Sequence, residues 1–565
     1  MHHTNKLLQT IGIGAVVLLL LGCAGSRPYT LGPVKTFDPD TSAIPEPDEK
    51  EQYQYWDRID NTTFHQLEKP LDLNRTFRFA GRMLGVAGDR QADNVNHLDQ
   101  VPESSWYSYR HYHNPMTPKE LARGPNTVQP DTAREWTIFR GKLEGANSGF
   151  FIEDANGNRF LIKFDGYKYP ELTTAAEVIS TKIFYGAGYY VPESTITYFD
   201  PENVRIGEGV KVSVDGETRP MTRQDYLDII KKRPRNKDGK IRALASKFVD
   251  GRPVGPWGFE GTRNDDPNDR VLHEHRRELR GMRVISSWLN DTDRRDANTM
   301  SVYTSESYIK HLVQDFGNTL GANGTSIHTP IYGQAYLIDP RYMALSAVAL
   351  GGYVRPWEQV EPEVRYPAVG YFKAEPFQPG HWVPVHPLPA FENMTLRDAF
   401  WGAKIVMSFS NEDIRAMVET GQISNPEAEE YLVQTLIDRR DKIGRYWFRR
   451  INPVAKFHAR IDNQKLVLQF DDLGVTGNVF SSSSSHYRYN VLHADKVLQK
   501  GERVNDSAIE IPLQMGPEKN RKAPLVVQIQ ITTHRPGSDI IAKETRVFVA
   551  LEDEGPRIVG VEREE

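Results

Sequence analysis

The sequence predicts a mixed α+β fold built from several structural units and ending in an all-β region. Three observations lead to this prediction. The chain has 565 residues, which at roughly 150 residues per domain is enough for three to four units. Short apolar runs separated by glycine-containing turns occupy residues 136–165, and segments with helical spacing follow them. After Pro453 apolar and polar residues alternate, as they do in the strands of a β-sandwich.

Composition limits the chemistry that the chain can perform. Lys plus Arg number 70 and Asp plus Glu number 75, which gives a net charge of −5. A nucleic-acid binder usually has a basic excess, so we expect no nucleic-acid partner. The only cysteine is Cys23, which excludes an intramolecular disulfide and any cysteine-cluster metal site. Chemistry must therefore come from carboxylates, lysines, histidines, hydroxyls or a bound ion.

The N-terminus predicts export. Residues 11–22 form an apolar run that is short for a membrane span but suits the core of a signal peptide. The tetrad Leu20-Leu21-Gly22-Cys23 resembles a bacterial lipobox, which implies a signal peptide over residues 1–22 and a lipidated Cys23. Ala24 in place of Asp after the cysteine implies the outer membrane, and the acyl chains would make the membrane a partner. The alternative is a soluble protein with an incidental cysteine.

Two segments precede the ordered pattern. Residues 23–62 are rich in proline and acidic residues, with few aliphatic ones, and are predicted to form an extended tether between the membrane and the folded part. Residues 63–130 are a mixed N-terminal extension to which the sequence assigns no chemistry.

A regular pattern of apolar runs and turns begins at Trp136. Runs at 136–143, 149–153 and 159–165 predict three antiparallel strands. Pro170 is expected to open a helix that Gly186 and Gly188 close, and an alternating strand follows around Ile196.

Further helices are predicted in the middle of the chain. Residues 276–289 form one, and Thr395, Ser410 and Asn425-Pro426 are expected to start three more, the last running through Trp447. On the first of these helices we expect a solvated face with salt bridges or, alternatively, a phosphate-recognition surface. That face is formed by Arg276, Arg277, Arg280 and Arg283.

Three residue groups in the first part of the chain are candidates for phosphate binding. Gly141, Gly145 and Gly149 flank or occupy a hairpin turn, where backbone N–H groups could approach phosphates, although hairpins also use glycine for steric reasons. Lys163 lies inside an apolar strand, where its ammonium needs an anion or must reach solvent. Glu177, on the following helix, could pair with Lys163 or could be a solvated surface residue.

The most specific pattern follows the 276–289 helix. Asp293 and Asn298 stand in the spacing Asp-x4-Asn, and an apolar strand 311–313 then leads to Asp315-Phe316-Gly317. These residue types supply a base, an amide oxygen and a carboxylate, which phosphoryl transfer needs to orient a hydroxyl and to hold Mg²⁺. Asp291 and Asp296 crowd the same loop and are alternative bases.

In chain order these pieces resemble the protein-kinase-like fold. Because His-Arg-Asp is missing, they are more similar to atypical branches such as the HipA-type and CotH-type kinases, and residues 141–193 also resemble a group of exported bacterial lipoproteins. The resemblance covers residues 136–450. It implies a two-lobed domain, with an antiparallel β N-lobe over residues 131–205 and a mostly helical C-lobe over 206–452. The alternation after Pro453 predicts a β-sandwich-like domain over 453–565.

The resemblance also implies roles. Lys163 would hold the phosphates of ATP or another nucleotide, Glu177 would orient Lys163, Asp293 would be the catalytic base, and Asn298 and Asp315 would bind Mg²⁺ or Mn²⁺. The implied function is an exported, membrane-anchored kinase with a protein, glycan or small-molecule acceptor. The alternative is an inactive pseudokinase that serves as a binding or scaffold lipoprotein in the cell envelope. The glycine spacing, the short interval from Lys163 to Glu177 and the absence of Ala-Pro-Glu depart from the kinase pattern.

Overall fold

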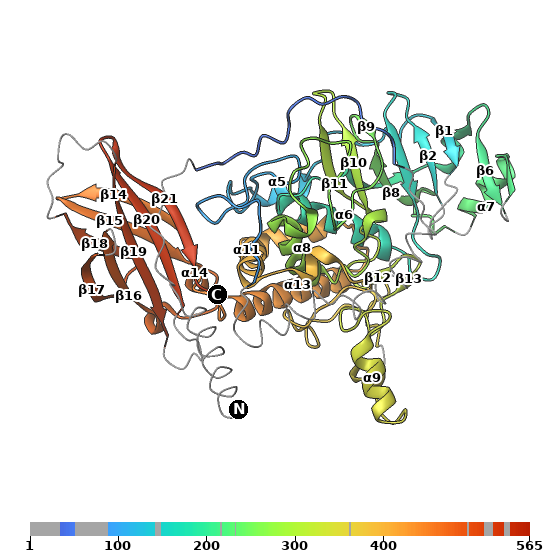
Figure 1. The fold of residues 1–565 in the computed structure, drawn as a ribbon. Coiled ribbons are helices and arrows are strands. Elements are labelled where there is room, and N and C mark those ends of the chain that lie inside the picture. The colour runs from blue at the N-terminus through green and yellow to red at the C-terminus, as the bar shows by residue number, and fades with distance from the viewer. Residues whose placement is uncertain are drawn as a thin grey trace, which may run out of the picture.

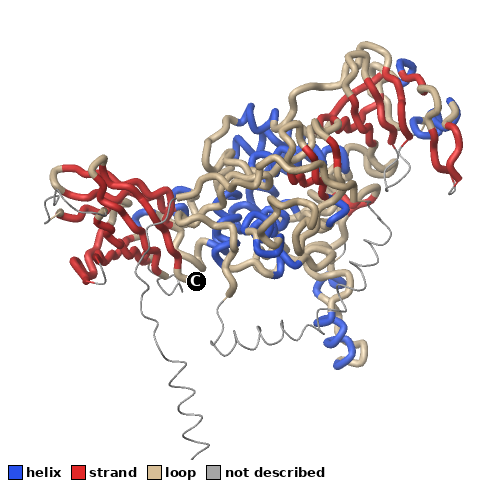
Figure 2. The backbone as a smooth tube through the Cα atoms, turned by 45° about the horizontal axis from the view of Figure 1, so that its top comes forward, coloured by secondary structure: helices blue, strands red, loops and turns tan. Residues whose placement is uncertain are grey.

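The computed structural model confirms the α+β class. It describes residues 34–50, 89–141, 149–214, 217–231, 233–360, 363–493, 496–513, 524–535 and 543–565. Strands gather at both ends of the molecule and helices fill the middle, so that a sheet region, a helical body and a second β region follow one another (Figure 1). Figure 2 shows the same order by secondary structure.

The first region is built on a six-stranded sheet. Its strands, in spatial order, are β4 (Ser194–Phe199), β8 (Ile241–Lys247), β3 (Arg159–Lys163), β2 (Gly149–Glu153), β1 (Trp136–Gly141) and β5 (Val204–Ile206). All neighbours are antiparallel except β1 and β5. The three strands expected after Trp136 are confirmed. The sheet continues past the expected lobe boundary at residue 205, because β8 pairs with both β3 and β4.

Helix α6 (Leu172–Gly186) packs against this sheet. It begins two residues after the proline that was expected to open it, because Glu171 has a left-handed backbone with φ 70°. The expected end at Gly186 is confirmed, and Gly188 follows with φ 108°. A side chain at Gly188 would collide with the ring of Tyr107, so glycine is required there.

Several small elements accompany the sheet and the helical body. They are the 3₁₀ turns η3 (Pro201–Asn203), η4 (His273–His275), η5 (Asp296–Asn298) and η6 (Pro356–Gln359), the ribbon β6 (Lys211–Val214) and β7 (Glu217–Pro220), helix α7 (Arg223–Ile230), the sheet of β9 (Arg252–Pro253), β10 (Thr299–Tyr303) and β11 (Ile309–Val313), the pair β12 (Ala322–Asn323) and β13 (Ser326–Ile327), and helix α9 (Pro340–Val348).

The helical body consists of α5 (Pro118–Arg123), α8 (Arg277–Leu289), α10 (Pro389–Glu392), α11 (Leu396–Val406), α12 (Asn411–Glu419) and α13 (Pro426–Trp447). The three expected caps are confirmed. Thr395 and Ser410 accept hydrogen bonds from the third residue of their helices, and Asn425 accepts from the first turn of α13. Apolar faces of α6, α8, α11 and α13 share one buried core, which includes Trp288 and Trp401.

The C-terminal region is an all-antiparallel β structure. One sheet has β14 (Val454–Asp462), β15 (Lys465–Asp472) and β18 (Ala508–Pro512), and the other has β17 (Lys496–Val504), β16 (His486–His493), β19 (Leu525–His534), β20 (Glu544–Glu552) and β21 (Gly555–Arg563), with short α14 (Leu473–Thr476) and η7 (Ser482–Ser484) between them. Most of the alternating apolar residues face inward, since Leu466, Leu468, Ile529 and Ile531 lie in one buried cluster drawn from both sheets. Ile461 of β14 does not, at 50% exposure.

Residues 34–50 belong to the segment predicted as a tether, yet they pack against the body. Ile44 is buried with Val254 and Ile309, and its N–H donates to the carbonyl of Ser307 at 2.7 Å. The buried carboxylate of Asp40 accepts from the N–H and the hydroxyl of Ser105, at 3.0 and 2.7 Å. Among the described residues, no helix is long and apolar enough to span a bilayer.

Candidate functional site

Lys163 and Glu177 form an ion pair between the sheet and helix α6. Lys163 ends β3, and its Nζ lies 2.9 and 3.1 Å from the two carboxylate oxygens of Glu177. The two side chains are only 11% and 7% exposed. Glu177 is therefore not a solvated surface residue. Lys163 has a second partner, since its Nζ lies 3.6 Å from Oδ1 of Asp315.

This pairing keeps Lys163 charged. Burial alone would lower the pKa of Lys163, but the carboxylates of Asp315 and Glu177 outweigh burial and hold that pKa above its usual range. Lys163 therefore keeps the charged ammonium group that phosphate binding requires.

A β-hairpin brings the two expected metal ligands together. Strands β10 and β11 pair antiparallel, with Thr299 opposite Val313. The residues that flank the hairpin therefore meet, and the N–H of Gln314 donates to the carbonyl of Asn298 at 3.0 Å. Asn298 and Asp315 lie at this junction. Asp315 has a left-handed backbone with φ 55°, and its side chain is 51% exposed.

The structure separates the three acids of the loop. Asp291 is fully buried against Arg294, and burial raises the pKa of Asp291 to about 6 although the guanidinium opposes the effect. Asp296 accepts the N–H of Phe259 at 3.3 Å. Asp293 is partly exposed, at 22% of its side chain. Of the three, Asp293 is the carboxylate with both exposure and contact to the expected metal ligand.

Two amides hold Asp293. The amide nitrogen of Asn298 donates to the carbonyl of Asp293 at 2.6 Å and to its carboxylate at 3.2 Å. The amide nitrogen of Asn318 donates to the same carboxylate oxygen at 2.8 Å. Because the Asn298 nitrogen is used in this way, its oxygen is the end that could meet a cation. Sequence reasoning missed Asn318, although it directly follows Asp-Phe-Gly.

Sequence reasoning also missed Arg294, which joins the two halves of the site. Its guanidinium donates to the carbonyls of Asn298 and Gln314, at 3.3 and 2.8 Å, and to that of Asp315. It also lies over the ring of Phe316, 4.8 Å from the centroid. Arg294 therefore fixes the loop of Asp293 against the segment of Asp315. Its place beside Asp293 in the sequence was the only signal.

The residues present fit a divalent cation that is shared with a nucleotide. In the part of the chain that the structure describes, no group of three or more His, Cys, Asp or Glu side chains is placed to hold a metal ion alone. Asp315 and Asn298 offer one carboxylate and one amide oxygen. Mg²⁺ is commonly bound by one or two carboxylates, with substrate phosphates and waters completing the shell.

The expected glycine turn is only partly described. Gly149 lies opposite Lys163 in the β2–β3 ladder, so strand β2 begins beside that lysine. Gly141 is pressed against the carbonyl of Lys211, which leaves no room for a side chain. Gly145 and the lipidation residue Cys23 lie outside the described residues.

A cavity of about 270 Å³ adjoins the turn that precedes Asp293. Trp382 lines it and donates to Oδ1 of Asn290 at 2.9 Å. Tyr332 lines it as well, and burial raises the pKa of Tyr332, an effect to which the nearby Asp293 carboxylate adds and which a hydrogen bond from Asn323 opposes. Gln378 and Arg439 are among the other lining residues, and no lining residue is acidic.

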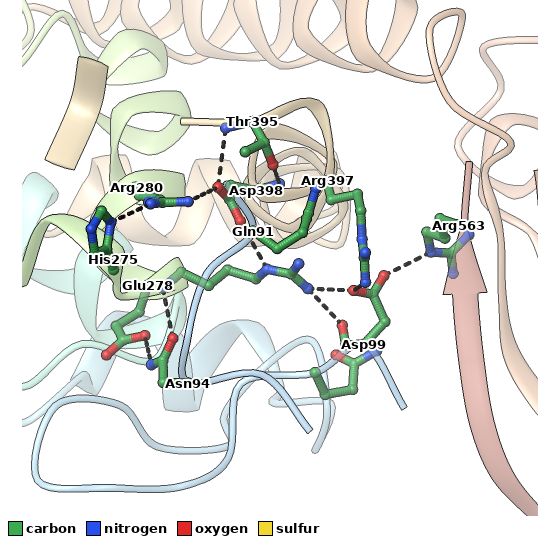
Figure 3. A network of polar contacts seen from close by, with 12 residues as sticks. Gln91, Asn94, Asp99, His275, Glu278, Arg280, Thr395, Arg397, Asp398 and Arg563 are labelled. Atoms are coloured by element: carbon green, nitrogen blue, oxygen red, sulfur yellow. Dashed lines mark hydrogen bonds and ion pairs between the residues drawn. The ribbon is translucent and has the colours of Figure 1, made fainter. Parts of the chain in front are cut away.

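The arginine face of α8 differs from the expectation. Arg276, Arg277 and Arg280 are buried, at 1%, 1% and 0% exposure, so the prediction of a solvated face is wrong. Residues 89–100 and helix α11 cover this face and supply the acids that pair with Arg277 and Arg280. Arg276 pairs instead with Asp269 and Glu278. Asp398 accepts from both Arg277 and Arg280, at 3.0 and 3.2 Å, as Figure 3 shows for Arg280.

The same network reaches the C-terminal region. Asp99 accepts from Arg277 at 2.6 Å. It also accepts from Arg397 at 2.8 Å and from Arg563 of β21 at 3.0 Å, both labelled in Figure 3. Burial would raise the pKa of Asp99, but the three guanidinium groups hold it well below its usual range. The side chain is 3% exposed. One carboxylate thus joins α8, α11 and the last strand.

Buried Lys182 gives α6 a predicted pH dependence. Its Nζ donates to the carbonyls of Arg123 and Ser194, at 3.1 and 3.0 Å, and burial lowers its pKa to about 7. Above pH 7 the unfolded chain keeps a proton that the folded chain has lost, so stability rises with pH. We expect this rise to be about 2 kcal/mol between pH 7 and pH 9 and to be absent in Lys182→Met. Urea unfolding at both pH values measures it.

The surface substitution Lys119→Met is the control for that experiment and should keep the parent's pH dependence. An unchanged slope in Lys182→Met would contradict the prediction.

Comparison with known proteins found neither a matching family model nor a matching curated protein. Among solved structures, the chain is similar to the crystal structure of the Golgi casein kinase with Mn/ADP bound, with 11% sequence identity and a TM-score of 0.24, over 73% of this chain and 96% of that one. This likeness is distant, and the function proposed below depends on the contacts within this chain.

Proposed function

We propose that the protein is a metal-dependent phosphotransferase of the atypical kinase type, which moves a phosphoryl group from a nucleotide to a hydroxyl acceptor. One observation carries the proposal. Lys163 on a sheet strand is paired with Glu177 on the adjacent helix and also meets Asp315, next to the loop that holds Asp293 and Asn298. Phosphoryl transfer by kinases uses these residue types in this arrangement.

The donor side of the proposed site lies around Lys163. Its ammonium would contact the phosphates of ATP or another nucleotide, and Glu177 would hold it in place. Asp315 and Asn298 would hold Mg²⁺ or Mn²⁺, which supplies neutralisation of phosphate charge. The turn between β1 and β2, which precedes Gly149, is the proposed cover of the phosphates.

The acceptor side lies around Asp293. Its carboxylate is oriented by two amides and stays partly exposed, so it can accept a proton from a hydroxyl. The 270 Å³ cavity beside Asn290 is the proposed acceptor site. Its lack of acidic residues and its Lys373 and Arg439 favour a polar or anionic acceptor, whether protein, glycan or small molecule.

One observation favours the alternative, a pseudokinase that binds partners in the envelope. Lys163 already contacts both Glu177 and Asp315, so the phosphate and metal residues neutralise one another. The lipid anchor at Cys23 and the location in the outer membrane are part of the proposal for both the kinase and the pseudokinase.

Nucleotide binding to the full chain tests the proposal. A nucleotide that binds only the folded state adds about 2.7 kcal/mol at a hundred times its Kd and raises the unfolding midpoint. We expect ATP with Mg²⁺ or Mn²⁺ to produce this shift. Asp315→Asn should remove the metal-dependent part of the shift, and Lys163→Ala should reduce the shift with or without metal.

The matched control is Lys247→Ala, which removes a Lys–Glu pair (Glu193, 3.1 Å) from the neighbouring strand β8 without touching the site. It should bind nucleotide as the parent does. If the parent shows no shift with any nucleotide and metal, the proposal fails. If the parent binds nucleotide but does not turn it over, the pseudokinase alternative replaces the proposal.

A further inference from the structure

Residues 337–360, which we call the α9 finger, project from the helical body. Both views show α9 standing apart from the other helices (Figures 1 and 2). Seven of the fourteen large apolar side chains that are exposed in the described residues lie in this segment. They are Leu337, Met343, Leu345, Val348, Leu350, Val354 and Val360. An apolar patch of this kind on a folded protein marks a contact surface.

The apolar surface is concentrated at the end of the finger. Val348 is 86% exposed and Leu350 is 95% exposed. From Tyr342 to Val354 the sequence has no charged residue. The chain reverses through Leu350, whose φ of 49° is unusual for a bulky side chain, and the N–H of Gly351 closes the turn on the carbonyl of Ser346 at 2.8 Å. This turn leaves the Leu350 side chain almost fully exposed.

The base of the finger has a different character. The rings of Tyr342 and Trp357 meet edge-on at 4.6 Å, and Tyr353 lies beside Tyr342. Arg341 and Arg355 flank the uncharged segment on its two sides, and each pairs with an acid of the same finger, Arg341 with Asp339 at 2.7 Å and Arg355 with Glu358 at 3.8 Å. From tip to base the order is aliphatic, aromatic and then charged. Aromatic side chains at the border between apolar and charged surface are the pattern of protein surfaces at a bilayer interface.

We propose that the α9 finger inserts into the surface of a lipid bilayer, with Leu350 deepest and the ion pairs of Arg341 and Arg355 at the level of the headgroups. The proposal is independent of the phosphotransferase proposal. Nine helical residues span about 14 Å, too short to cross a hydrocarbon core of about 30 Å but long enough to enter one leaflet.

Exposure on nearly all sides of α9 favours lipid over a protein groove. From Arg341 to Leu350 every side chain is exposed except those of Tyr342 and Ser346, which are half-buried. A helix that docks on a protein usually presents one apolar stripe. Lipid chains surround an inserted tip and so can cover all of its sides.

A single-site probe tests insertion directly. Because Cys23 is the only cysteine, Cys23→Ser combined with Leu350→Cys leaves one thiol, which can carry an environment-sensitive fluorophore. With vesicles of phosphatidylethanolamine and phosphatidylglycerol, we expect a blue shift and protection from an aqueous quencher. The control places the same probe by Ser483→Cys, an exposed site in the C-terminal region, which should show neither change.

A second experiment measures the contribution of the tip. In the full chain with Cys23→Ser, adding V348D and L350D should lower partitioning into these vesicles by at least about tenfold. The matched control adds V497D and L498D, which alters two exposed apolar residues of β17, at 49% and 50% exposure, and should bind as the parent does.

Either of two results would overturn the proposal. One is a Leu350→Cys probe that does not respond to vesicles. The other is a chain whose oligomers dissociate in V348D/L350D while its vesicle binding is unchanged, because a second copy of the chain would then be the true cover of the finger.

Discussion

Asp99→Ala is expected to lower the free energy of unfolding by about 3–5 kcal/mol, because it leaves buried guanidinium groups without their shared carboxylate. Asp99 accepts from Arg277, Arg397 and Arg563, which come from α8, α11 and β21. Urea unfolding followed by tryptophan fluorescence measures the loss.

The loss should also depend on pH. The pKa of Asp99 is depressed in the folded state, so its contribution is complete above the unfolded value of about 3.9 and disappears as pH falls toward the folded value. Asp99→Ala should therefore flatten the acid limb of the stability curve.

The matched control is Glu430→Ala, which breaks a two-pronged pair with Arg415 at the surface, at 2.7 and 3.1 Å. It should stay close to the parent, since exposed ion pairs contribute little. If Asp99→Ala is as mild as this control, the network does not hold the C-terminal region to the body.

The second large effect concerns turnover. Asp293→Asn should lower kcat by about 10²–10⁴-fold, because an amide cannot take the acceptor's proton. Nucleotide binding should be preserved, since Asp293 lies on the acceptor side and Lys163 and Asp315 on the donor side. Steady-state rates and the thermal shift, measured on the same variant, separate the two steps.

Asp291→Asn is the comparison for that variant. It removes the buried partner of Arg294, so its main cost should be stability, with turnover per folded molecule retained. Normal turnover in Asp293→Asn, together with its loss in Asp291→Asn or Asp296→Asn, would move the base to another residue.

The features that could be predicted from the sequence depend on local signals. The strands after Trp136 and the caps Thr395, Ser410 and Asn425 require only neighbouring residues, and the structure confirms them. The contact of Lys163 with Glu177 was predictable because an ammonium within an apolar strand needs a carboxylate nearby.

The features that could not be predicted depend on contacts with segments that are far away in the sequence. Arg277 and Arg280 have the charge of surface residues, and only segment 89–100 and helix α11, far away in sequence, bury them. Strand β8 could not be placed either, because it joins the sheet through β3 and β4 rather than through its neighbours in sequence. The contacts of Arg294 and Asn318 in the site could not be predicted for the same reason, because they depend on the pairing of β10 with β11.

The packing of residues 34–50 on the body shortens the reach of the proposed anchor. With a lipid on Cys23, only residues 24–33 remain between the membrane and the packed segment. At about 3.6 Å per residue they extend at most about 36 Å. A linker of that length makes any contact between the body and the same bilayer intramolecular, with an effective concentration in the millimolar range. Even a weak membrane contact would then be occupied most of the time, without any increase in its own affinity.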